Sequence, residues 1–560
     1  MNLKEELAKS IARETKLSFE EINSQISNPP NPNMGDFAFA CFKLGNPHEE
    51  ALKLKEKIKL PKSIEKAVVE GPYLNFFLDH KEVARELLTT ILKEKKNYGK
   101  SKSKKKIVIE YCGPNTNKPL HLGHVRNMAL GKALCNTLEF SGNKVHPVNI
   151  INDRGVHICQ SMLAYQKWSD NQQPNKKGDH FVGDYYVLFA NKVKENPQLK
   201  EEVQKMLQLW EANDKEVRKL WKKMNSWVLE GFAQTYNRFG ISFEKEYFES
   251  KIYEKGKEVA QEGLKKGVFI KDKENAIVAP LEKFNLPNKV VLRADGTSIY
   301  ITQDMYLAKV RYQDYKFDKM FYVVASEQRL HFQQLFKILE LLGNSFAKNL
   351  NHLSYGLVNL PTGRMKSREG TVVDADDLLD EMSKVAQKEV RARYQNLSEK
   401  EIQRRAEIIG LAAIKFFMLR TDATRDIVFN PEESISFEGE TGPYIQYAYA
   451  RACSILRKAK DEKKQKKTNI TIEDPLEKRI ISQLLLFPSL MQEVERTYKI
   501  HLICRYLLDL SQAFNEFYHA CPVLIEDDAV RSTRLKIVEA VTVVLSSGLS
   551  LLGIEAPQEM

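Results

Sequence analysis

Apolar and polar residues follow two different patterns within the first hundred residues. The chain starts with apolar residues at helical spacing and passes through the breaker-rich stretch NPPNPNMGDFAFACF (28–42). It then reaches GPYLNFFLD (71–79), where the alternation is that of a strand. This pattern predicts a small α+β module over residues 1–100. The polar, basic run KNYGKSKSKKK (96–106) is typical of a linker, either a solvated hinge or a segment that contacts a polyanion.

A different pattern begins at Lys106. The β-branched run KIVIEY (106–111) predicts a strand, and PNTNKP (114–119) predicts a turn-rich loop. The helical spacing of HLGHVRNMALGKALCNTLEF (121–140) and the apolar run KVHPVNII (144–151) predict a helix and a second strand. Together they form a βαβ unit of a parallel sheet. Such sheets bind ligands beyond the carboxyl ends of their strands.

The remaining pattern divides the chain further. Residues of about 155–290 are charged and mostly helical in pattern, which predicts an insertion between two halves of the sheet. Strand patterns return at KVVLRA (289–294), KMFYVVAS (319–326) and LSYGLVNL (353–360). The chain is therefore expected to contain a parallel-sheet domain over 104–375, a helical connector over 376–430 and an all-helical domain over 431–560.

Length and apolar content limit the class of protein. With 560 residues the chain is too long for one hydrophobic core, and its 42% apolar residues are typical of a folded protein. No apolar run approaches the ~18–20 residues that cross a bilayer. The acidic residues within the opening MNLKEELAKSIARET predict an amphipathic helix, not a targeting segment. We expect a cytoplasmic protein that does not contact a membrane.

Cysteines and charge add two weaker indications. The seven cysteines are scattered without any C-x-x-C pair, which argues against a zinc ribbon and a disulfide framework, so no protein-bound zinc is expected. The net charge of +12 suits a polyanionic partner, because each neutralised phosphate releases counterions. Many basic proteins bind no nucleic acid, so charge alone does not identify the partner.

The tetrapeptide HLGH, from His121 to His124, carries the first candidate chemistry. It lies after a predicted strand and at the start of a predicted helix, where free N–H groups and a partial positive charge favour phosphate. The two imidazoles add donors for the same anion. Gly123 has no Cβ, so a ribose or an adenine ring can lie against the backbone there.

The second candidate is the basic loop GRMKSREG (363–370), which directly follows the strand pattern at 353–360. A loop of this composition can close over a triphosphate and bring cations to the oxygens that gain charge in the transition state. Taken singly, a basic surface loop is the simpler interpretation. The order of the two elements on one predicted sheet favours the phosphate-binding one.

HLGH and the basic loop resemble the signature pair of class I aminoacyl-tRNA synthetases, and the wider match is to arginyl-tRNA synthetases. This resemblance implies an α/β protein with a Rossmann-type parallel-sheet catalytic domain, an N-terminal α+β module that contacts the corner of tRNA, and a C-terminal all-α bundle that binds the anticodon. The segments that carry it are EYCGPNTNKPLHLGH (110–124), SIYITQDMYLA (298–308), YVVASEQRLH (322–331), MKSREGTVV (365–373) and TGPYIQYAYAR (441–451).

A planar guanidinium requires carboxylates that accept paired N–H bonds, and the sequence offers candidates. Glu110 ends the first predicted strand, while Tyr300 and Asp304 are four residues apart and share a face of a predicted helix. Alone, Asp304 is also typical of a helix surface and Tyr300 of a core. The resemblance implies that these three residues bind the guanidinium of arginine and that Asn115 and Gln328 hold its other polar end.

The basic loop departs from the usual class I pattern. Where the family usually has a lysine this chain has Ser367, and the nearest lysine is Lys366, with further cations at Arg364 and Arg368. In arginyl enzymes a lysine just upstream of the first signature is thought to compensate, and Lys118 has that position. We therefore expect Lys118, more than Lys366, to neutralise charge on ATP.

The resemblance implies a two-step reaction in which arginine and ATP form arginyl-adenylate and the arginyl group then passes to tRNA(Arg). Adenylate formation is expected to require bound tRNA, Mg²⁺ is expected to accompany ATP, and no protein nucleophile is needed. We expect a monomer with no metal ligands of its own. The implied catalytic residues are His121, His124, Lys118 and Lys366, and the implied ATP-binding residues are His121, Gly123, His124, Met365, Lys366 and Ser367.

Three other functions stay open at this stage. Another class I synthetase is one, although a cysteine enzyme needs clustered zinc ligands and paired carboxylates suit a cationic substrate. A catalytically silent tRNA-binding relative is the second, but both signatures remain. A nucleotidyltransferase is the third, and it has no need of the C-terminal helical domain. That domain carries aromatic residues at helical spacing within 499–524, where core packing and base stacking both fit: Tyr506, Phe514, Phe517 and Tyr518.

Overall fold

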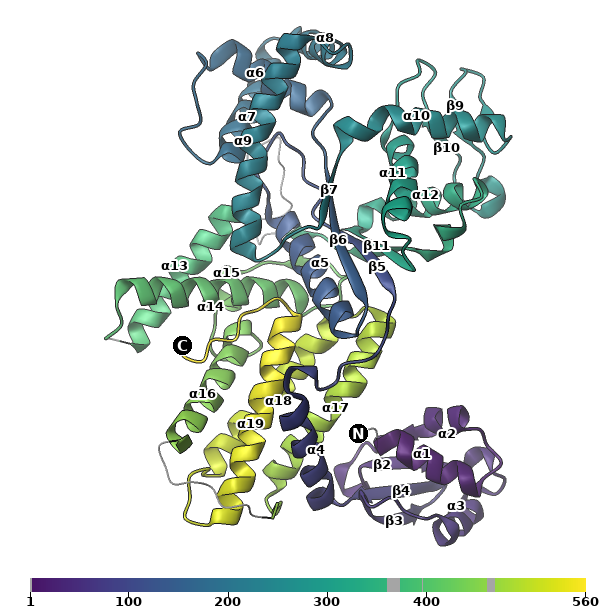
Figure 1. Cartoon of the computed structure of the whole chain (residues 1–560), viewed down its shortest axis with the longest axis vertical. Helices are drawn as coiled ribbons and strands as arrows, with labels where there is room; N and C mark the ends of the chain where they lie inside the picture. The colour runs from purple at the N-terminus through teal and green to yellow at the C-terminus, as the bar shows by residue number, and fades with distance from the viewer. Residues whose placement is uncertain (1–2, 360–372, 395, 461–468) are drawn as a thin grey trace.

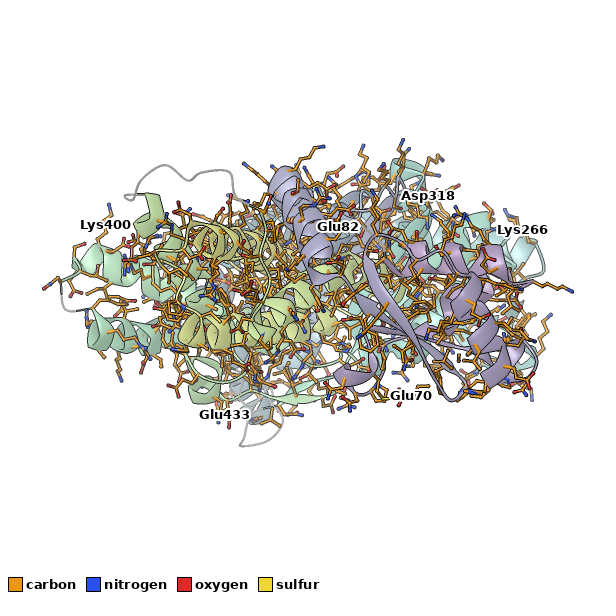
Figure 2. The ribbon with its side chains drawn as sticks, turned by 90° about the horizontal axis from the view of Figure 1, so that it is seen from below. Glu70, Glu82, Lys266, Asp318, Lys400 and Glu433 are labelled. Carbon is orange, nitrogen blue, oxygen red and sulfur yellow. The ribbon has the colours of Figure 1, made fainter. Side chains whose placement is uncertain are left out.

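The computed structural model of the chain describes residues 3–359, 373–394, 396–460 and 469–560. Figure 1 shows a parallel sheet at the centre, with helices of an insertion above it and a long helical region below it. The N-terminal module lies beside the C-terminal helices in both Figure 1 and Figure 2. A groove of about 1130 Å³ separates this module from the neighbouring helix α17 (Pro475–Thr497). No helix among the described residues is both long and apolar enough to span a membrane.

The N-terminal module is a four-stranded antiparallel sheet covered by three helices, with order β1-β2-β4-β3. The strands bury Phe39 and Phe76 in the same hydrophobic core as Leu7 and Ile11 of the first helix. Its elements are α1 (Leu3–Glu14), α2 (Phe19–Gln25), β1 (Ile26–Ser27), β2 (Phe37–Ala40), α3 (Pro47–Lys57), β3 (Ile64–Glu70) and β4 (Tyr73–Leu78).

Helix α4 (His80–Glu94) connects this module to the C-terminal helices, where it packs against α17 and α19 (Asp528–Leu551). The basic run that follows is not a solvated hinge. Tyr98 is buried and its hydroxyl donates to the carbonyl of Leu484 over 3.0 Å. The hydroxyl of Ser101 donates to the carbonyl of Ser141 over 2.7 Å. These buried partners anchor the connection to both neighbouring domains.

The central sheet is parallel throughout, with order β12-β11-β5-β6-β7. After β5 the chain adds strands on one side, and from β11 it adds them on the other, so the order reverses between β5 and β11. Ligands bind at such a reversal point. The strands are β5 (Lys106–Glu110), β6 (Lys144–Ile151), β7 (Lys245–Phe248), β11 (Lys319–Ala325) and β12 (Leu350–Tyr355), and the helices beside them are α5 (Leu122–Phe140), α10 (Glu249–Lys265), α11 (Tyr300–Tyr315) and α12 (Arg329–Leu341).

The region 155–290 differs in two ways from a purely helical insertion. Its strand β7 pairs in parallel with β6 and forms the edge of the central sheet. The expected strand at 289–294 appears as β10 (Lys289–Leu292), but it belongs to a separate antiparallel sheet with β8 (Ile270–Lys271) and β9 (Ile277–Ala279). The helices that stand above the sheet in Figure 1 are α6 (Val156–Trp168), α7 (Gly178–Glu195), α8 (Leu199–Glu211) and α9 (Lys215–Phe239).

The rest of the described chain is almost entirely helical. A short parallel pair, β13 (Val358–Asn359) and β14 (Ile427–Val428), ties it to the catalytic half. Three of the four aromatic candidates, Tyr506, Phe514 and Phe517, are buried, whereas Tyr518 is 39% exposed. The first three therefore form core and only Tyr518 faces solvent. The helices are α13 (Ala375–Arg393), α14 (Glu399–Leu419), α15 (Pro431–Ser434), α16 (Gly442–Lys460), α17, α18 (His501–Ala520) and α19.

Candidate active site

A cavity of about 750 Å³ opens at the carboxyl ends of β5 and β11. The structure brings together here most of the residues that the sequence singled out. Lys118 is not among the residues that line the cavity but precedes His121 by three positions. Met365, Lys366 and Ser367 lie outside the described residues. The predicted site residues that line the cavity are Glu110, Asn115, His121, Gly123, His124, Tyr300, Asp304 and Gln328.

The two histidines are held by the start of α5. His121 is the N-cap residue, and its Nδ1 accepts a hydrogen bond from the backbone N–H of Gly123 over 3.1 Å. Nδ1 of His124 accepts from the backbone N–H of His121, also over 3.1 Å. The rings are 4.0 Å apart between centroids. Because each Nδ1 is an acceptor, each neutral ring carries its proton on Nε2 and has that N–H left to donate.

Both imidazoles are neutral at physiological pH. Burial, reinforced by the positive charge of Lys118, lowers the pKa of His121 to about 3. Burial also lowers the pKa of His124, and the neighbouring His121 and Lys118 add to the effect. The site can therefore offer two fixed N–H donors at the positive end of a helix without placing two cations there.

The chain returns to the histidine turn just before α13. The backbone N–H of Leu122 donates to the carbonyl of Val373 over 3.0 Å, and the N–H of Ala375 donates to the carbonyl of Leu120 over 2.9 Å. His121 and Asp374 form the antiparallel bridge between these two bonds. The segment that follows the basic loop in sequence thus lies against the first signature.

Arg126 joins the site to the chain around β13 and β14. It is fully buried on α5, and Nη1 donates to the carbonyl of Gly356 over 2.7 Å. Nη2 donates to the carbonyls of Ala423 and Arg425 over 3.2 and 2.9 Å. Burial lowers the pKa of Arg126 to about 10, so it remains charged at neutral pH. This fork fixes the end of β12 relative to the histidine helix.

Glu110 is not a free carboxylate. It is buried at the end of β5 and forms an ion pair with Arg311, which is itself buried on α11. Burial lowers the pKa of Arg311 to about 10, which leaves it charged. One side of the Glu110 carboxylate is therefore neutralised within the protein, and removing either partner would leave a buried charge.

Asp304 and Tyr300 lie on one face of α11, as their spacing predicts. Oδ2 of Asp304 lies 2.8 Å from Nε2 of His331 on α12. Tyr300 is 70% exposed at the cavity, so the core interpretation of this residue is excluded. Asn115 lies in a parallel bridge with Asn152, which follows β6. Glu110 at the end of β5 and Asp304 on α11 both line the cavity that contains the histidines.

The sequence analysis did not single out three residues of the site: Asn127 and His331 line the cavity, and Arg311 pairs with Glu110. Oδ1 of Asn127 accepts from the backbone N–H of Cys112, and its amide donates to the carbonyl of Val323 over 2.7 Å. It thereby fixes Cys112, which has a left-handed φ of 81°. Helical spacing was the available signal, because each missed residue is one or two turns from a predicted one: Asn127 from His124, His331 from Gln328 and Arg311 from Asp304.

Comparison with known protein families decides the assignment. The model described as "tRNA synthetases class I (R), catalytic domain" matches residues 87–431. The chain belongs to the arginyl-tRNA synthetases. Two further models match, "Arginyl tRNA synthetase N terminal domain" over residues 1–78 and "DALR anticodon binding domain" over residues 445–560. The family and the fold class predicted from the sequence are confirmed.

Individual arginyl-tRNA synthetases agree with this assignment. The chain is 46% identical to an arginine–tRNA ligase of Treponema denticola, over 97% of this chain and 95% of the relative. It is 43% identical to the ligase of Treponema pallidum, over 96% and 94%. The solved arginyl-tRNA synthetase of Thermus thermophilus superposes with a TM-score of 0.85 at 26% identity and covers both chains fully.

Proposed function

We propose that this chain ligates arginine to tRNA(Arg) in the cavity at the ends of β5 and β11, and that ATP binds there as a substrate. Arginine–tRNA ligation follows from the family, and class I membership implies ATP. The observation that carries the proposal to this cavity is its lining. Two imidazole N–H donors at a helix N-terminus share one cavity with the carboxylates of Glu110 and Asp304.

The first step joins the arginine carboxylate to the α-phosphorus of ATP and releases pyrophosphate. Negative charge spreads over the phosphate oxygens as the bond to the leaving group breaks. His121 and His124 donate from Nε2 to these oxygens, and the N-terminus of α5 adds its partial positive charge. The donors are fixed before ATP binds, so they need no reorganisation during the reaction. No side chain acts as a nucleophile.

ATP has further proposed partners. Gly123 lines the cavity in the first turn of α5 and is a proposed contact of the nucleoside; a Cβ there would lie 2.9 Å from Cε1 of His121, so glycine leaves room for that imidazole. Lys118 supplies a cation whose charge acts on both histidines. One observation supports Lys118: its positive charge adds to burial in lowering the pKa of both imidazoles. Met365, Lys366 and Ser367 of the basic loop, which lie outside the described residues, are further proposed contacts of ATP. Mg²⁺ accompanies the phosphates of ATP.

Arginine lies on the opposite wall. Its guanidinium donates to Glu110 and Asp304 and lies beside Tyr300, while Asn115 and Gln328 hold the α-amino and carboxylate end. Arg311 supports this arrangement by fixing one oxygen edge of Glu110. His331 supports it in the same way for Asp304. A site built for paired N–H donors rejects amino acids that lack them.

The second step transfers the arginyl group to the 2′ hydroxyl of the terminal adenosine of tRNA. The proposed division of labour is a tRNA-contacting module over 1–100, a catalytic domain over 104–375 with its insertion at about 155–290, a connector over 376–430 and an anticodon-binding domain over 431–560. The family match to an anticodon-binding domain over 445–560 supports the last assignment. A cytoplasmic monomer stays a prediction from the sequence.

The alternatives are less well supported. Another class I synthetase is not favoured, because the catalytic match and the N-terminal match are both to arginyl enzymes. A silent relative would have no use for two tautomer-fixed histidines in a cavity that also presents carboxylates.

One assay tests the proposal directly. Purified protein is incubated with ATP, Mg²⁺, total tRNA and each of the twenty amino acids in turn, and charged tRNA is measured. Arginine alone should be attached. Attachment of another amino acid, or of none, would contradict the proposal.

A second measurement follows pyrophosphate exchange into ATP with and without tRNA. Exchange should require tRNA, and rapid exchange without it would contradict that requirement.

A further inference from the structure

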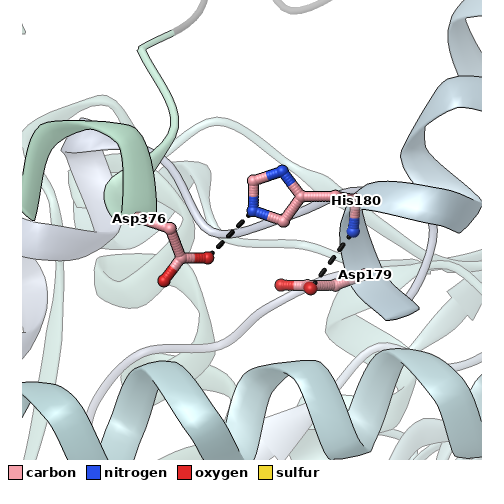
Figure 3. A group of neighbouring side chains, drawn as sticks. All are labelled: Asp179, His180 and Asp376. Carbon is pink, nitrogen blue, oxygen red and sulfur yellow. Dashed lines mark hydrogen bonds and ion pairs between the residues drawn. The ribbon is translucent and has the colours of Figure 1, made fainter. Parts of the chain in front are cut away.

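A polar cluster lies where α7 and α9 of the insertion meet the start of α13. Figure 3 shows three of its members, Asp179 and His180 on α7 and Asp376 on α13. Nε2 of His180 lies 2.9 Å from Oδ2 of Asp376. Lys177 and Thr235 complete the group, which we call the α7 cluster: Lys177, Asp179, His180, Thr235 and Asp376.

The cluster already contains its own cation. Asp179, His180 and Asp376 offer ligand atoms that lie within 4.8 Å of one another, a spacing that a metal ion could bridge. The ammonium of Lys177, however, lies 2.8 Å from Oδ2 of Asp179 and 2.7 Å from Oδ2 of Asp376. It also donates to the hydroxyl of Thr235 over 2.7 Å. An internal ammonium therefore occupies the position that a bound cation would need.

The local packing is shaped around these contacts. A Cβ on Gly231 of α9 would come within 2.3 Å of Oδ1 of Asp179, and a Cβ on Gly178 would come within 2.1 Å of the Trp227 carbonyl oxygen. Both positions thus need glycine for α7 and α9 to approach this closely. Asp179 is completely buried and its charge is compensated by Lys177.

The charges of the cluster favour an ionised Asp376 beside a protonated His180. Burial raises the pKa of Asp376, but hydrogen bonds from His180, Lys177 and Thr235 outweigh it and bring that pKa down to about 2. The hydrogen bond to Asp376 is the main cause of a raised pKa for His180, and the nearby Asp179 and Asp374 add to it. A buried, compensated network of this kind holds its members in one geometry.

The cluster is connected to the ATP site from two directions. Asp376 is two residues beyond Asp374, which bridges to His121, and Ala375 between them donates to Leu120 over 2.9 Å. On the other side, a Cβ on Gly183 of α7 would lie 2.8 Å from Cδ of Pro119. Helix α7 therefore contacts Pro119 directly and the turn from Leu120 to His124 through the start of α13.

We propose that Lys177, His180 and Asp376 are positioning residues for the ATP site. They hold the segment Val373–Ala375 against the turn from Leu120 to His124, and α7 packs directly against Pro119. The Nε2 donors of His121 and His124 are thereby kept where the phosphates of ATP meet them. This gives the helical insertion a role in adenylate formation. The inference rests on the proposed function, because it takes ATP to bind at these histidines.

The test compares two substitutions on α13 that are alike in chemistry. Asp376→Asn removes the charge at the centre of the cluster. Asp380→Asn, one turn further along the same helix, removes an ion pair with Arg238 that also joins α13 to α9 but lies outside the cluster. Aminoacylation is measured with ATP, arginine and tRNA varied separately. Wild-type protein must charge tRNA in this assay, and its failure to do so would overturn the proposed function itself.

Asp376→Asn should lower kcat/KM for ATP about 10- to 100-fold, because a small displacement of the donors weakens every phosphate contact. The KM values for arginine and tRNA should stay within about twofold of wild type. Asp380→Asn should change kcat/KM for ATP, KM for arginine and KM for tRNA by no more than about twofold. Equal effects of the two substitutions, or an equal loss for all three substrates, would overturn the inference.

If Asp376→Asn does not fold, Thr235→Val removes one hydrogen bond to Asp376 without a change in charge. It should lower kcat/KM for ATP alone by about 3- to 10-fold, and an unchanged value would likewise overturn the inference.

Discussion

The backbone N–H of His121 donates to Nδ1 of His124 over 3.1 Å, so the first histidine fixes the tautomer of the second. The N–H of Gly123 does the same for His121. A turn that caps its own helix with two imidazoles thus presents two Nε2 protons to the cavity. Capping and catalysis use opposite nitrogens of the same rings, and substitutions can therefore separate the two roles.

Replacing His121 by asparagine should slow adenylate formation and preserve the cap. The Oδ1 atom of asparagine accepts the same backbone N–H, whereas the distal donor is lost. The rate of arginyl-adenylate formation should fall about 10²- to 10³-fold. His121→Ala should lose the same factor and also about 1 kcal/mol of stability through the missing cap. Single-turnover kinetics and thermal melting check both effects, and a near-wild-type rate in His121→Asn would contradict the donor role.

Stability should depend on pH through the same histidine. The pKa of His121 is about 3 in the folded protein and 6.5 by its ordinary value, so the unfolded chain takes up the proton first as pH falls. Wild-type stability should be unaffected by this group above pH 6.5 and should decrease below it. At pH 5 the loss is about 2 kcal/mol. His121→Asn lacks this loss, so its melting temperature relative to wild type should rise between pH 7.5 and pH 5. A difference that does not change with pH would contradict the neutral, buried state.

Lys118 should matter more than Lys366 for ATP. Its charge reaches both imidazoles, and its neighbour Pro119 is held by α7. Lys118→Ala should lower tRNA-dependent pyrophosphate exchange about 10²-fold or more, the effect of losing one preorganised charge. Lys366→Ala should lower it by a factor about ten times smaller. A larger effect of Lys366→Ala than of Lys118→Ala would show that Lys366 of the basic loop neutralises the charge on ATP.

The sequence predicted those features that depend on local pattern. Helical spacing placed Tyr300 and Asp304 on one face, and the strand–loop–helix pattern placed His121 at the start of α5. Pairing between distant segments leaves no local signature. The pattern therefore indicated neither that β7 joins the central sheet nor that Arg311 neutralises Glu110 from 201 residues away.

Asp304 should decide affinity for arginine. Asp304→Asn keeps the shape of the side chain but removes the charge that faces the guanidinium, which should raise KM for arginine about 10- to 100-fold. KM for ATP should change little. Asp314→Asn is the matched control, because Asp314 lies on the same helix but pairs with Lys245 and Tyr247 outside the cavity. An equal rise in both variants would show that the effect is one of helix stability and not of binding.

Tyr518 should contact RNA, whereas its buried neighbours should not. Its ring is 39% exposed and lies 4.7 Å from the guanidinium of Arg451, so a base can stack on the open part of the same surface. Tyr518→Ala should weaken tRNA binding by about 1–3 kcal/mol and leave the melting temperature nearly unchanged. Phe514 is fully buried on the same helix, and Phe514→Ala should instead cost about 3–5 kcal/mol of stability. Filter binding of tRNA and thermal melting on both variants separate the two effects. If Tyr518→Ala binds tRNA as tightly as wild type, the anticodon is read by another part of the helical domain.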